Sequence, residues 1–287
     1  MPFTVRPVPG RGPQQHRKPT WRQFVKKLIS AVFVAALAIG TTLGAAQADT
    51  KEWTKVRIGV EGAYPPFSEV TPDGKLIGFD IDIANALCEE MKVECELITQ
   101  DWDGIIPALN ARKYDAIIAS MSITDERREK VDFTIKYYNT PAKFVRKKGS
   151  GIEITEEGLK GKVVGVQRAT IHDMFISEVY GGVAEVKRYG SQDEAYLDMV
   201  AGRVDLLLAD SVALDGGFLQ TDAGKDYEFV GPDFNDPKHF GEGAGIALRK
   251  GEADLLQMFN TAIEAIRANG TYKAIQDKYF GFDVYGS

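Results

Sequence analysis

The sequence predicts an α/β protein built as two lobes. Short apolar runs alternate with segments of helical periodicity from residue 56 to the end of the chain. A buried strand that leads directly into the start of a helix is predicted near residues 115–126 and again near residues 162–175. Two segments, 137–145 with its Pro141 and 235–240, are predicted to cross between the lobes.

The first part of the chain predicts strand, turn, strand and helix in that order. Residues 56–60 alternate toward a strand, and residues 71–74 (TPDG) are typical of a tight turn before a short strand at 76–79. A helix is predicted to begin at Asp80, which we expect to cap it, because apolar residues then recur at helical spacing as far as Met91. Further strands are expected at 93–99 and 115–119, with helices through 105–109 and after Thr124.

The second part of the chain repeats this alternation and ends in two helices. Gly270 follows the first of these and is typical of a helix stop. Strands are predicted at 162–167, 186–189, 206–209, 229–232 and 245–248, and helices at 155–159, after His172, and at 193–201, 253–269 and 271–280.

Residues 1–48 are predicted to be a signal peptide with an N-terminal extension. A basic pair precedes an apolar run over 28–43, and residues 46–48 (AQA) form the small-x-small pattern of signal peptidase. The run is shorter than the ~20 strongly apolar residues of a membrane-spanning helix. We therefore expect cleavage after Ala48 and a mature protein in the periplasm; whether translation starts at Met1 or near Val25 stays open.

The remainder of the chain is acidic. The full chain, with 44% hydrophobic residues, has enough apolar material for one or two packed domains. Removing the first 48 residues takes away seven of the 35 Lys and Arg and none of the 41 Asp and Glu, which leaves a formal net charge of −13. Such a charge argues against nucleic acid as a partner, because its binding depends on neutralising phosphates.

The turn after the predicted strand 115–119 is a candidate anion site. Ser120 and Ser122 follow the strand, and Thr124 stands at the N-cap of a charged helix, where free backbone N–H groups and the helix dipole favour an anion. Arg127 in the first turn can grip a carboxylate with two hydrogen bonds. These residues favour a pocket for the head group of an amino acid, and the alternative is a capped surface helix with a solvated face.

Polar and aromatic residues also follow other predicted strands. Glu61 and Tyr64 lie on a loop that Pro65 and Pro66 prevent from continuing as strand, at the edge where open α/β sheets bind ligands. Trp102 follows the strand 93–99 and can stack on a cationic side chain. The alternatives are a surface acid and two core aromatic residues.

The second lobe contributes a similar set. Gln167 ends a strand, and Thr170 with Ile171 stands at a helix start that can bind a carboxylate through backbone N–H groups. Asp210 follows four apolar residues, a position where an acid points to a function. His172 has no partner in view, so we expect a polar residue at a helix start rather than a catalytic or metal-binding one.

Cys88 and Cys95 are the only cysteines. In an exported chain they most simply form one disulfide, and the alternative is a pair of buried free thiols. A metal site is not expected, because no histidine lies nearby to complete a ligand set, and we expect no cofactor.

Several segments together resemble the periplasmic solute-binding proteins of polar amino acid ABC importers, a family 3 group with the type II periplasmic binding protein fold. The lysine/arginine/ornithine- and histidine-binding proteins are the nearest in pattern, with opine-binding proteins close behind. The match runs in one order from about Val56 to the C-terminus. It is carried by GVEGAYPPFS (59–68), GFDIDIANALC (78–88), QDWDGIIPAL (100–109), KYDAI (113–117), SMSITDERREKVDFT (120–134) and GTYKAIQDKYFGFDVYG (270–286).

This resemblance implies a split first lobe, 49–139 with 239–287, and a continuous second lobe, 140–238. The ligand is then expected in the cleft between them, with closure by a hinge motion at the two crossings. It also implies a disulfide between Cys88 and Cys95, a membrane ABC permease complex as partner, and a monomer without enzymatic activity.

The resemblance further implies the role of each site residue. The ligand carboxylate is expected to bind Arg127, Ser122 and Thr170, and its ammonium Asp210 and Ser120. Its side chain is expected to meet Glu61, Tyr64, Trp102 and Gln167, while Ala119 and Ile171 also face the ligand.

Four positions depart from the pattern of the basic amino acid binders. Glu61 replaces an aspartate, Ala119 a serine, Gln167 an apolar residue and Ile171 a threonine. A negative group for a cation is kept, so we expect arginine, ornithine, lysine or histidine as ligand, with an opine as alternative. Other classes are a cyclohexadienyl dehydratase, which would need Glu61 as general acid, and a sensor module acting through a separate membrane kinase.

Overall fold

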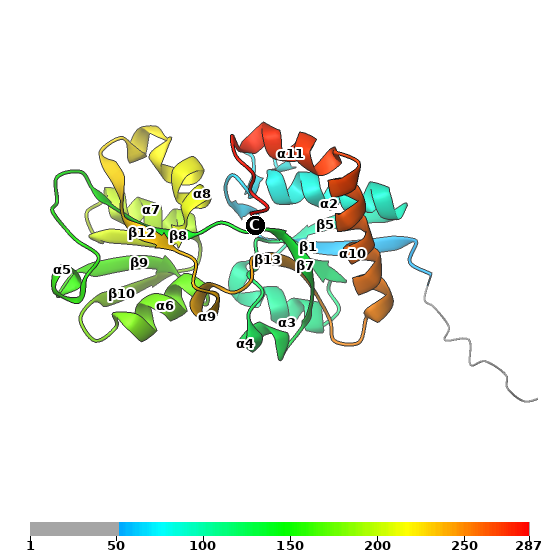
Figure 1. Cartoon of the computed structure of the whole chain (residues 1–287), viewed down its shortest axis with the longest axis horizontal. Helices are drawn as coiled ribbons and strands as arrows, with labels where there is room; N and C mark the ends of the chain where they lie inside the picture. Colours follow the sequence, from blue (N-terminus) through cyan, green and yellow to red (C-terminus); the bar gives the residue numbers. More distant parts are fainter. Residues whose placement is uncertain (1–51, 287) are drawn as a thin grey trace, which may run out of the picture. The chain divides into compact units, whose positions relative to one another are not determined.

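A computed structural model describes residues 52–286 of the protein. These residues form two five-stranded sheets with helices packed against them, and a small three-stranded sheet (Figure 1). The predicted signal peptide and extension, residues 1–48, lie outside the described residues. Within residues 52–286, no helix has the length and apolar character needed to cross a membrane.

The first sheet combines strands from both ends of the described chain. Strand β1 pairs in parallel with β5 and β6, whereas β13 pairs antiparallel with β6 and β7, so the C-terminal part completes this sheet. The order is β5 (Glu94–Thr99), β1 (Lys55–Val60), β6 (Ala116–Ile117), β13 (Ala244–Leu248) and β7 (Asp132–Tyr138). The small sheet contains β2 (Ala63–Tyr64), β3 (Ser68–Val70) and β4 (Leu76–Ile77).

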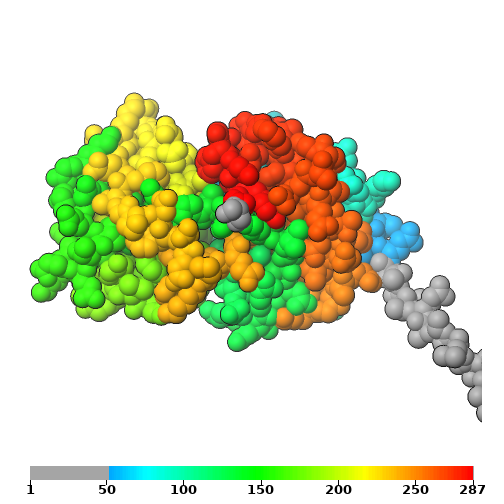
Figure 2. Space-filling model, in the orientation of Figure 1, coloured from blue at the N-terminus to red at the C-terminus, as the bar shows by residue number. Residues whose placement is uncertain are grey.

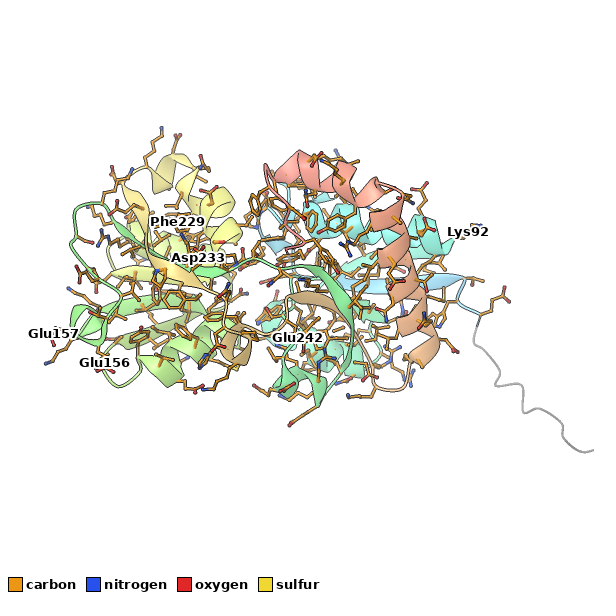
Figure 3. The ribbon with its side chains drawn as sticks, in the orientation of Figure 1. Lys92, Glu156, Glu157, Phe229, Asp233 and Glu242 are labelled. Carbon is orange, nitrogen blue, oxygen red and sulfur yellow. A yellow bond between two sulfur atoms is a disulfide. The ribbon has the colours of Figure 1, made fainter. Side chains whose placement is uncertain are left out.

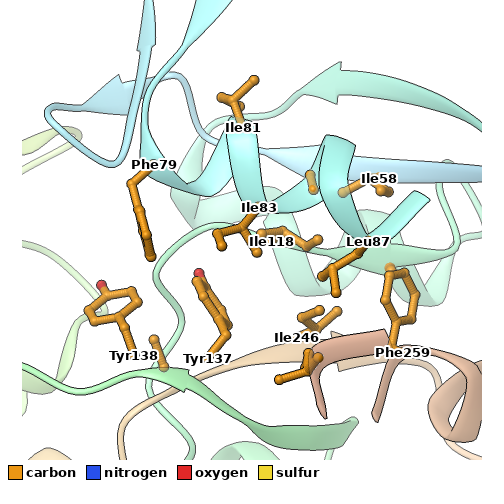
Figure 4. Close-up of a cluster of buried hydrophobic side chains, with 14 of the residues drawn as sticks. Ile58, Phe79, Ile81, Ile83, Leu87, Ile118, Tyr137, Tyr138, Ile246 and Phe259 are labelled. Atoms are coloured by element: carbon orange, nitrogen blue, oxygen red, sulfur yellow. The ribbon is translucent and has the colours of Figure 1, made fainter. Parts of the chain in front are cut away.

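Helices cover both faces of the first sheet. Successive strand residues point to opposite faces, so Ile246 packs in one cluster with α2 and α10, while Ile117 and Ala247 pack in another with α3. Figure 4 shows part of the former cluster, with Leu87 of α2 near Phe259 of α10. The helices are α2 (Phe79–Met91), η1 (Trp102–Gly104), α3 (Ile105–Asn110), α4 (Asp125–Arg128), α10 (Ala253–Ala268) and α11 (Thr271–Tyr279).

The second sheet follows the same principle. On β11, Leu206 and Leu208 pack with α6, while Leu207 and Ala209 pack with α7, and none of the four side chains is exposed. The order is β10 (Glu185–Tyr189), β9 (Val163–Gln167), β11 (Leu206–Asp210), β8 (Ala142–Lys147) and β12 (Tyr227–Phe234). Its helices are α5 (Glu156–Leu159), α6 (Ile171–Val179), α7 (Gln192–Val200), α8 (Ser211–Leu214), η2 (Asp215–Leu219) and η3 (Asp222–Gly224).

The chain passes between the two sheets twice, from β7 to β8 and from β12 to β13. Helix α9 (Pro237–Phe240) lies in the second passage, which ends near Glu242; Figure 3 labels this residue and Asp233 on β12. The amide of Asn139 in the first passage donates to the carbonyl of Val284 at 2.9 Å, which places the C-terminal segment, red in Figure 2, against it. The lobe boundaries at 139/140 and 238/239 stay predictions.

The start of α2 differs from the expectation. The helix begins at Phe79, and its N-cap is Gly78, with φ of 123°. A Cβ atom at Gly78 would lie 2.3 Å from the carbonyl oxygen of Phe67, so only glycine fits this close approach. Asp80 is therefore not the cap, and the strand predicted at 76–79 ends at Ile77.

The predicted disulfide is present and joins Cys88 of α2 to Cys95 of β5, so the alternative of two free thiols is wrong. The bond closes a loop between residues seven positions apart. It ties the outer strand of the first sheet to the helix that packs on it.

We expect the double variant Cys88→Ser with Cys95→Ser to have a free energy of unfolding lower by about 2 to 3 kcal/mol, because the short loop is then unconstrained in the unfolded chain. Denaturant unfolding measures the change. Dithiothreitol should lower the midpoint of the wild type and leave that of the variant unchanged. Equal midpoints for the oxidised wild type and the variant would contradict this prediction.

Candidate functional site

The predicted site residues gather where strands of both sheets end. Glu61 follows β1, Ser120 follows β6, Gln167 ends β9 and Asp210 ends β11. Ligand sites in open α/β sheets form at this edge of the strands.

Two adjoining cavities, of about 320 and 370 Å³, lie at these strand ends. Ten of the eleven predicted site residues line the first cavity, and Asp210 lines the second. Because several residues belong to both linings, we treat the two as one cleft. The residues shared by both are Tyr64, Ser120, Ser122, Ile171 and His172.

Arg127 places a buried positive charge in the cleft. Only 6% of the residue is exposed, and burial lowers the pKa of its guanidinium to about 10. The guanidinium donates to the carbonyl of Ser122 at 2.9 Å and to that of Ala169 at 3.4 Å, and it lies 5.2 Å from the centre of the Trp102 ring. Within residues 52–286 it forms no salt bridge, so an anionic ligand would supply the missing opposite charge.

Threonine caps begin the helices on both sides of the cleft. The Thr124 hydroxyl accepts from the amide of Arg127 at 3.3 Å at the start of α4. The Thr170 hydroxyl accepts from the amide of Asp173 at 3.2 Å and donates to the carbonyl of Gln167 at 2.7 Å. Both caps agree with the residue types that favour this position, and each helix directs its N-terminal end toward the strand-end turn.

Two turns in the cleft adopt left-handed backbone conformations without glycine. Ser120 has φ of 52° and Ala169 has φ of 57°, conformations that cost a side-chain-bearing residue about 1 to 2 kcal/mol. Hydrogen bonds hold both turns. The amide of Ser120 donates to the Tyr137 hydroxyl at 3.0 Å, and the carbonyl of Ala169 accepts from Nε1 of Trp102 at 3.2 Å.

Asp210 places a buried carboxylate in the cleft. One oxygen accepts from the amides of Val212 and Ala213, at 2.8 and 3.2 Å, and so caps α8. The other accepts from the Thr140 hydroxyl, in the first passage between the sheets. Burial raises the pKa of Asp210 to about 6 even though these hydrogen bonds favour its charged form.

Glu61 and Gln167 meet across the cleft. Nε2 of Gln167 donates to a carboxylate oxygen of Glu61 at 2.6 Å. Burial raises the pKa of Glu61 to about 8, because the carboxylate has lost water without gaining a cation. A positively charged group placed beside Glu61 would reverse this shift.

Further contacts join the two sides around the cleft. The guanidinium of Arg168 forms a salt bridge with Asp103 at the rim. A Cβ atom at Gly217, in η2, would lie 3.1 Å from the carbonyl oxygen of Pro65, so the second lobe also approaches the loop that carries Glu61 and Tyr64. The described structure therefore has the two lobes in contact.

Two residues at the cleft, His172 and Thr140, are not among the site residues predicted from the sequence. His172 lies at the start of α6, as expected, but it also lines both cavities, and burial lowers its pKa to about 3, so its imidazole is neutral. Its position directly after Thr170 and Ile171, two predicted site residues, could have indicated that His172 also lines the cleft. For Thr140, whose hydroxyl donates to Asp210, the sequence offers no signal beyond its place beside Pro141. Within residues 52–286, no group of three or more His, Cys, Asp and Glu is arranged to hold a metal ion.

Comparison with known proteins shows the family of the chain. The model of the family "Bacterial extracellular solute-binding proteins, family 3" matches residues 56–282. The L-arginine-binding protein of Pseudomonas aeruginosa is 61% identical over 233 residues, 81% of this chain and 90% of that protein. The lysine/arginine/ornithine-binding periplasmic protein of Escherichia coli is 40% identical over 262 residues, 91% of this chain and 99% of that protein.

A solved structure confirms the predicted two-lobe α/β fold. An ancestral arginine-binding protein bound to arginine is 37% identical, with a TM-score of 0.74. The alignment covers 79% of this chain and 99% of that one.

The left-handed conformation of Ala169 is expected to lower the stability of the folded protein. Replacement of Ala169 by glycine should raise the free energy of unfolding by about 0.5 to 1 kcal/mol, because the left-handed conformation no longer opposes a Cβ atom. The control is Ala274→Gly in α11, an exposed helical position, where the same substitution should lower it by about 0.5 to 1 kcal/mol. Denaturant unfolding of both variants decides the matter, and destabilisation of both would contradict it.

Proposed function

The chain belongs to the bacterial extracellular solute-binding proteins of family 3, and we propose that it captures a basic amino acid, arginine first, for an ABC importer. Its fold is that of the type II periplasmic binding proteins. The names of its relatives describe binding proteins, and we propose no catalytic step.

The observation that carries the proposal is the pair of opposite charges buried in one cleft. Arg127 has no anionic partner within the described residues, and Asp210 has no cationic one. In an α-amino acid the carboxylate and the ammonium are attached to the same carbon atom. One ligand can therefore pair with Arg127 and with Asp210 at once. Ser122 and Thr170 are proposed to assist Arg127, and Ser120 to assist Asp210.

The other end of the cleft is proposed to bind the ligand's side chain. Glu61 would pair with a guanidinium, and Gln167, already bonded to Glu61, would orient it. The rings of Tyr64 and Trp102 line the same cavity and would cover the side-chain stem. Ala119 and Ile171 add apolar surface to the same lining. The 61% identity to an L-arginine-binding protein supports arginine over the other basic amino acids.

Closure follows from a ligand that touches both sides. Arg127 and Glu61 belong to the first lobe and Asp210 and Gln167 to the second, so a ligand gains all four contacts only when the lobes are together. We propose that the closed monomer, exported to the periplasm by its signal peptide, is what a membrane ABC permease complex recognises.

Calorimetric titration of residues 49–287, stripped of carried-over ligand, tests the function. The ligands are arginine, lysine, ornithine, histidine, octopine and nopaline, with neutral and acidic amino acids for comparison. Binding of arginine ahead of the others is the expected result. Binding of an opine alone would move the specificity to that class, and binding of none of them would overturn the proposal.

Removal of either head-group charge should abolish tight binding. We expect Arg127→Met and Asp210→Asn each to weaken arginine binding by about 3 kcal/mol or more, because the ligand charge then loses its buried partner. Arg128→Met is the matched control, since Arg128 is the next residue but forms an exposed salt bridge with Glu242. Unchanged affinity in the Arg127 or Asp210 variant would remove that residue from the site.

The pKa of Glu61 makes arginine binding depend on pH. With the lobes in contact and the cleft empty, as in this structure, Glu61 is mostly protonated below about pH 8; a bound guanidinium favours its charged form, so filling this cleft releases a proton. The affinity should therefore rise by up to about tenfold per pH unit between pH 6 and pH 8. Titrations across this range measure the slope. Glu61→Gln should bind cationic ligands more weakly and with a flatter slope, and an equal slope in both proteins would refute the role of Glu61.

A further inference from the structure

Behind the cleft lies a buried carboxyl group that the proposed site does not use. Asp80, in the first turn of α2, is only 1% exposed and lines neither cavity. One of its oxygens accepts from the Ser120 hydroxyl and the other from the Tyr137 hydroxyl, both at 2.9 Å. The amide of Ser120 donates to the Tyr137 oxygen at 3.0 Å, which closes a triangle of three residues.

This triangle determines where the hydroxyl hydrogens point. The Tyr137 oxygen accepts from the Ser120 amide, so its own hydrogen is directed to Asp80. Figure 4 shows the Tyr137 ring with its hydroxyl toward the start of α2. The Ser120 hydroxyl also donates to Asp80, which leaves its oxygen lone pairs as the group that it can offer to the cleft.

The negative charge of Asp80 also favours this direction of the hydroxyl hydrogens. Two hydroxyl donors and the first turn of a helix favour its carboxylate form. Burial opposes that form and raises the pKa of Asp80 to about 7, and the negative charge of Asp210 adds to the shift. In its carboxylate form Asp80 can only accept hydrogen bonds, so it keeps the hydroxyl hydrogens of Ser120 and Tyr137 directed toward it.

We propose that Asp80 is a positioning residue that makes Ser120 an obligatory hydrogen-bond acceptor, so that the site selects ligands with an α-ammonium over 2-hydroxy acids with the same side chain. The inference rests on the proposed function. An ammonium has three N–H donors and can serve Ser120 and Asp210 together, whereas an α-hydroxyl has one and leaves one acceptor unsatisfied.

The experiment measures arginine and its 2-hydroxy analogue, 2-hydroxy-5-guanidinopentanoate, by calorimetric competition in four proteins: wild type, Asp80→Asn, Ser120→Ala and the double variant. The asparagine offers N–H groups to the triangle and forces a hydroxyl hydrogen to turn. Asp80→Asn should weaken arginine binding about tenfold and the analogue by less than about threefold, because the positioned acceptor matters mainly to the ammonium.

The double variant separates positioning from general structure. If Asp80 acts through Ser120, Asp80→Asn should change arginine binding by less than about twofold once Ser120 is alanine. Additive effects of the two substitutions, or an unchanged preference for arginine over the analogue in Asp80→Asn, would overturn the inference. If Asp80→Asn does not fold, Ser120→Ala alone must still lower the preference for arginine over the analogue. An unchanged preference in Ser120→Ala would also overturn the inference.

Asp115→Asn is the matched control. Asp115 is a buried acid of the same sheet region, and it forms salt bridges with Arg57 and Arg249 instead of contacting the cleft. Its replacement should reduce stability while leaving the preference for arginine unchanged. If the wild type binds no basic amino acid, the proposed function itself is refuted. If the wild type binds arginine but Asp80→Asn weakens the binding of both ligands equally, only the role of Asp80 is refuted.

Discussion

The structure depends on three charged side chains that are buried without a group of opposite charge beside them within residues 52–286. Arg127, Asp210 and Glu61 all line the cleft, and burial moves the pKa of each toward the neutral form, to about 10, 6 and 8. Bringing the lobes together around an empty cleft is therefore opposed by the lost hydration of these groups. A ligand with matching charges would remove that opposition, so the proposed recognition and the proposed closure share one electrostatic cause.

The rest of the fold holds these charges in place. Strand ends deliver the acids, threonine caps begin the two helices at the turns, and left-handed residues at Ser120 and Ala169 turn the backbone toward the cleft. The carbonyl of Ala169 accepts from both Trp102 and Arg127, so a residue of one lobe organises two of the other. Backbone strain is retained here because several hydrogen bonds share in holding it.

Residue types and strand ends predicted much of this from the sequence. Glu61, Gln167 and Asp210 could be found because each follows a short apolar run, and Thr124 and Thr170 because threonine before a helix is typical of a cap. The triangle of Asp80, Ser120 and Tyr137 could not, because its members are 17 to 57 positions apart and meet only through tertiary packing. Gly78 as the true cap depended on a close approach to Phe67 that no local pattern reveals.

The topology of the first sheet has a consequence for biosynthesis. Strand β13 lies between β6 and β7, so the sheet lacks a central strand until residues 244–248 have been made, whereas all five strands of the second sheet come from one continuous stretch. The second lobe can therefore assemble from one continuous part of the chain, while the first waits for almost the whole chain. The lobe that carries Arg127 and Glu61 is thus the last to form, and a cleft with both walls needs a chain complete as far as β13.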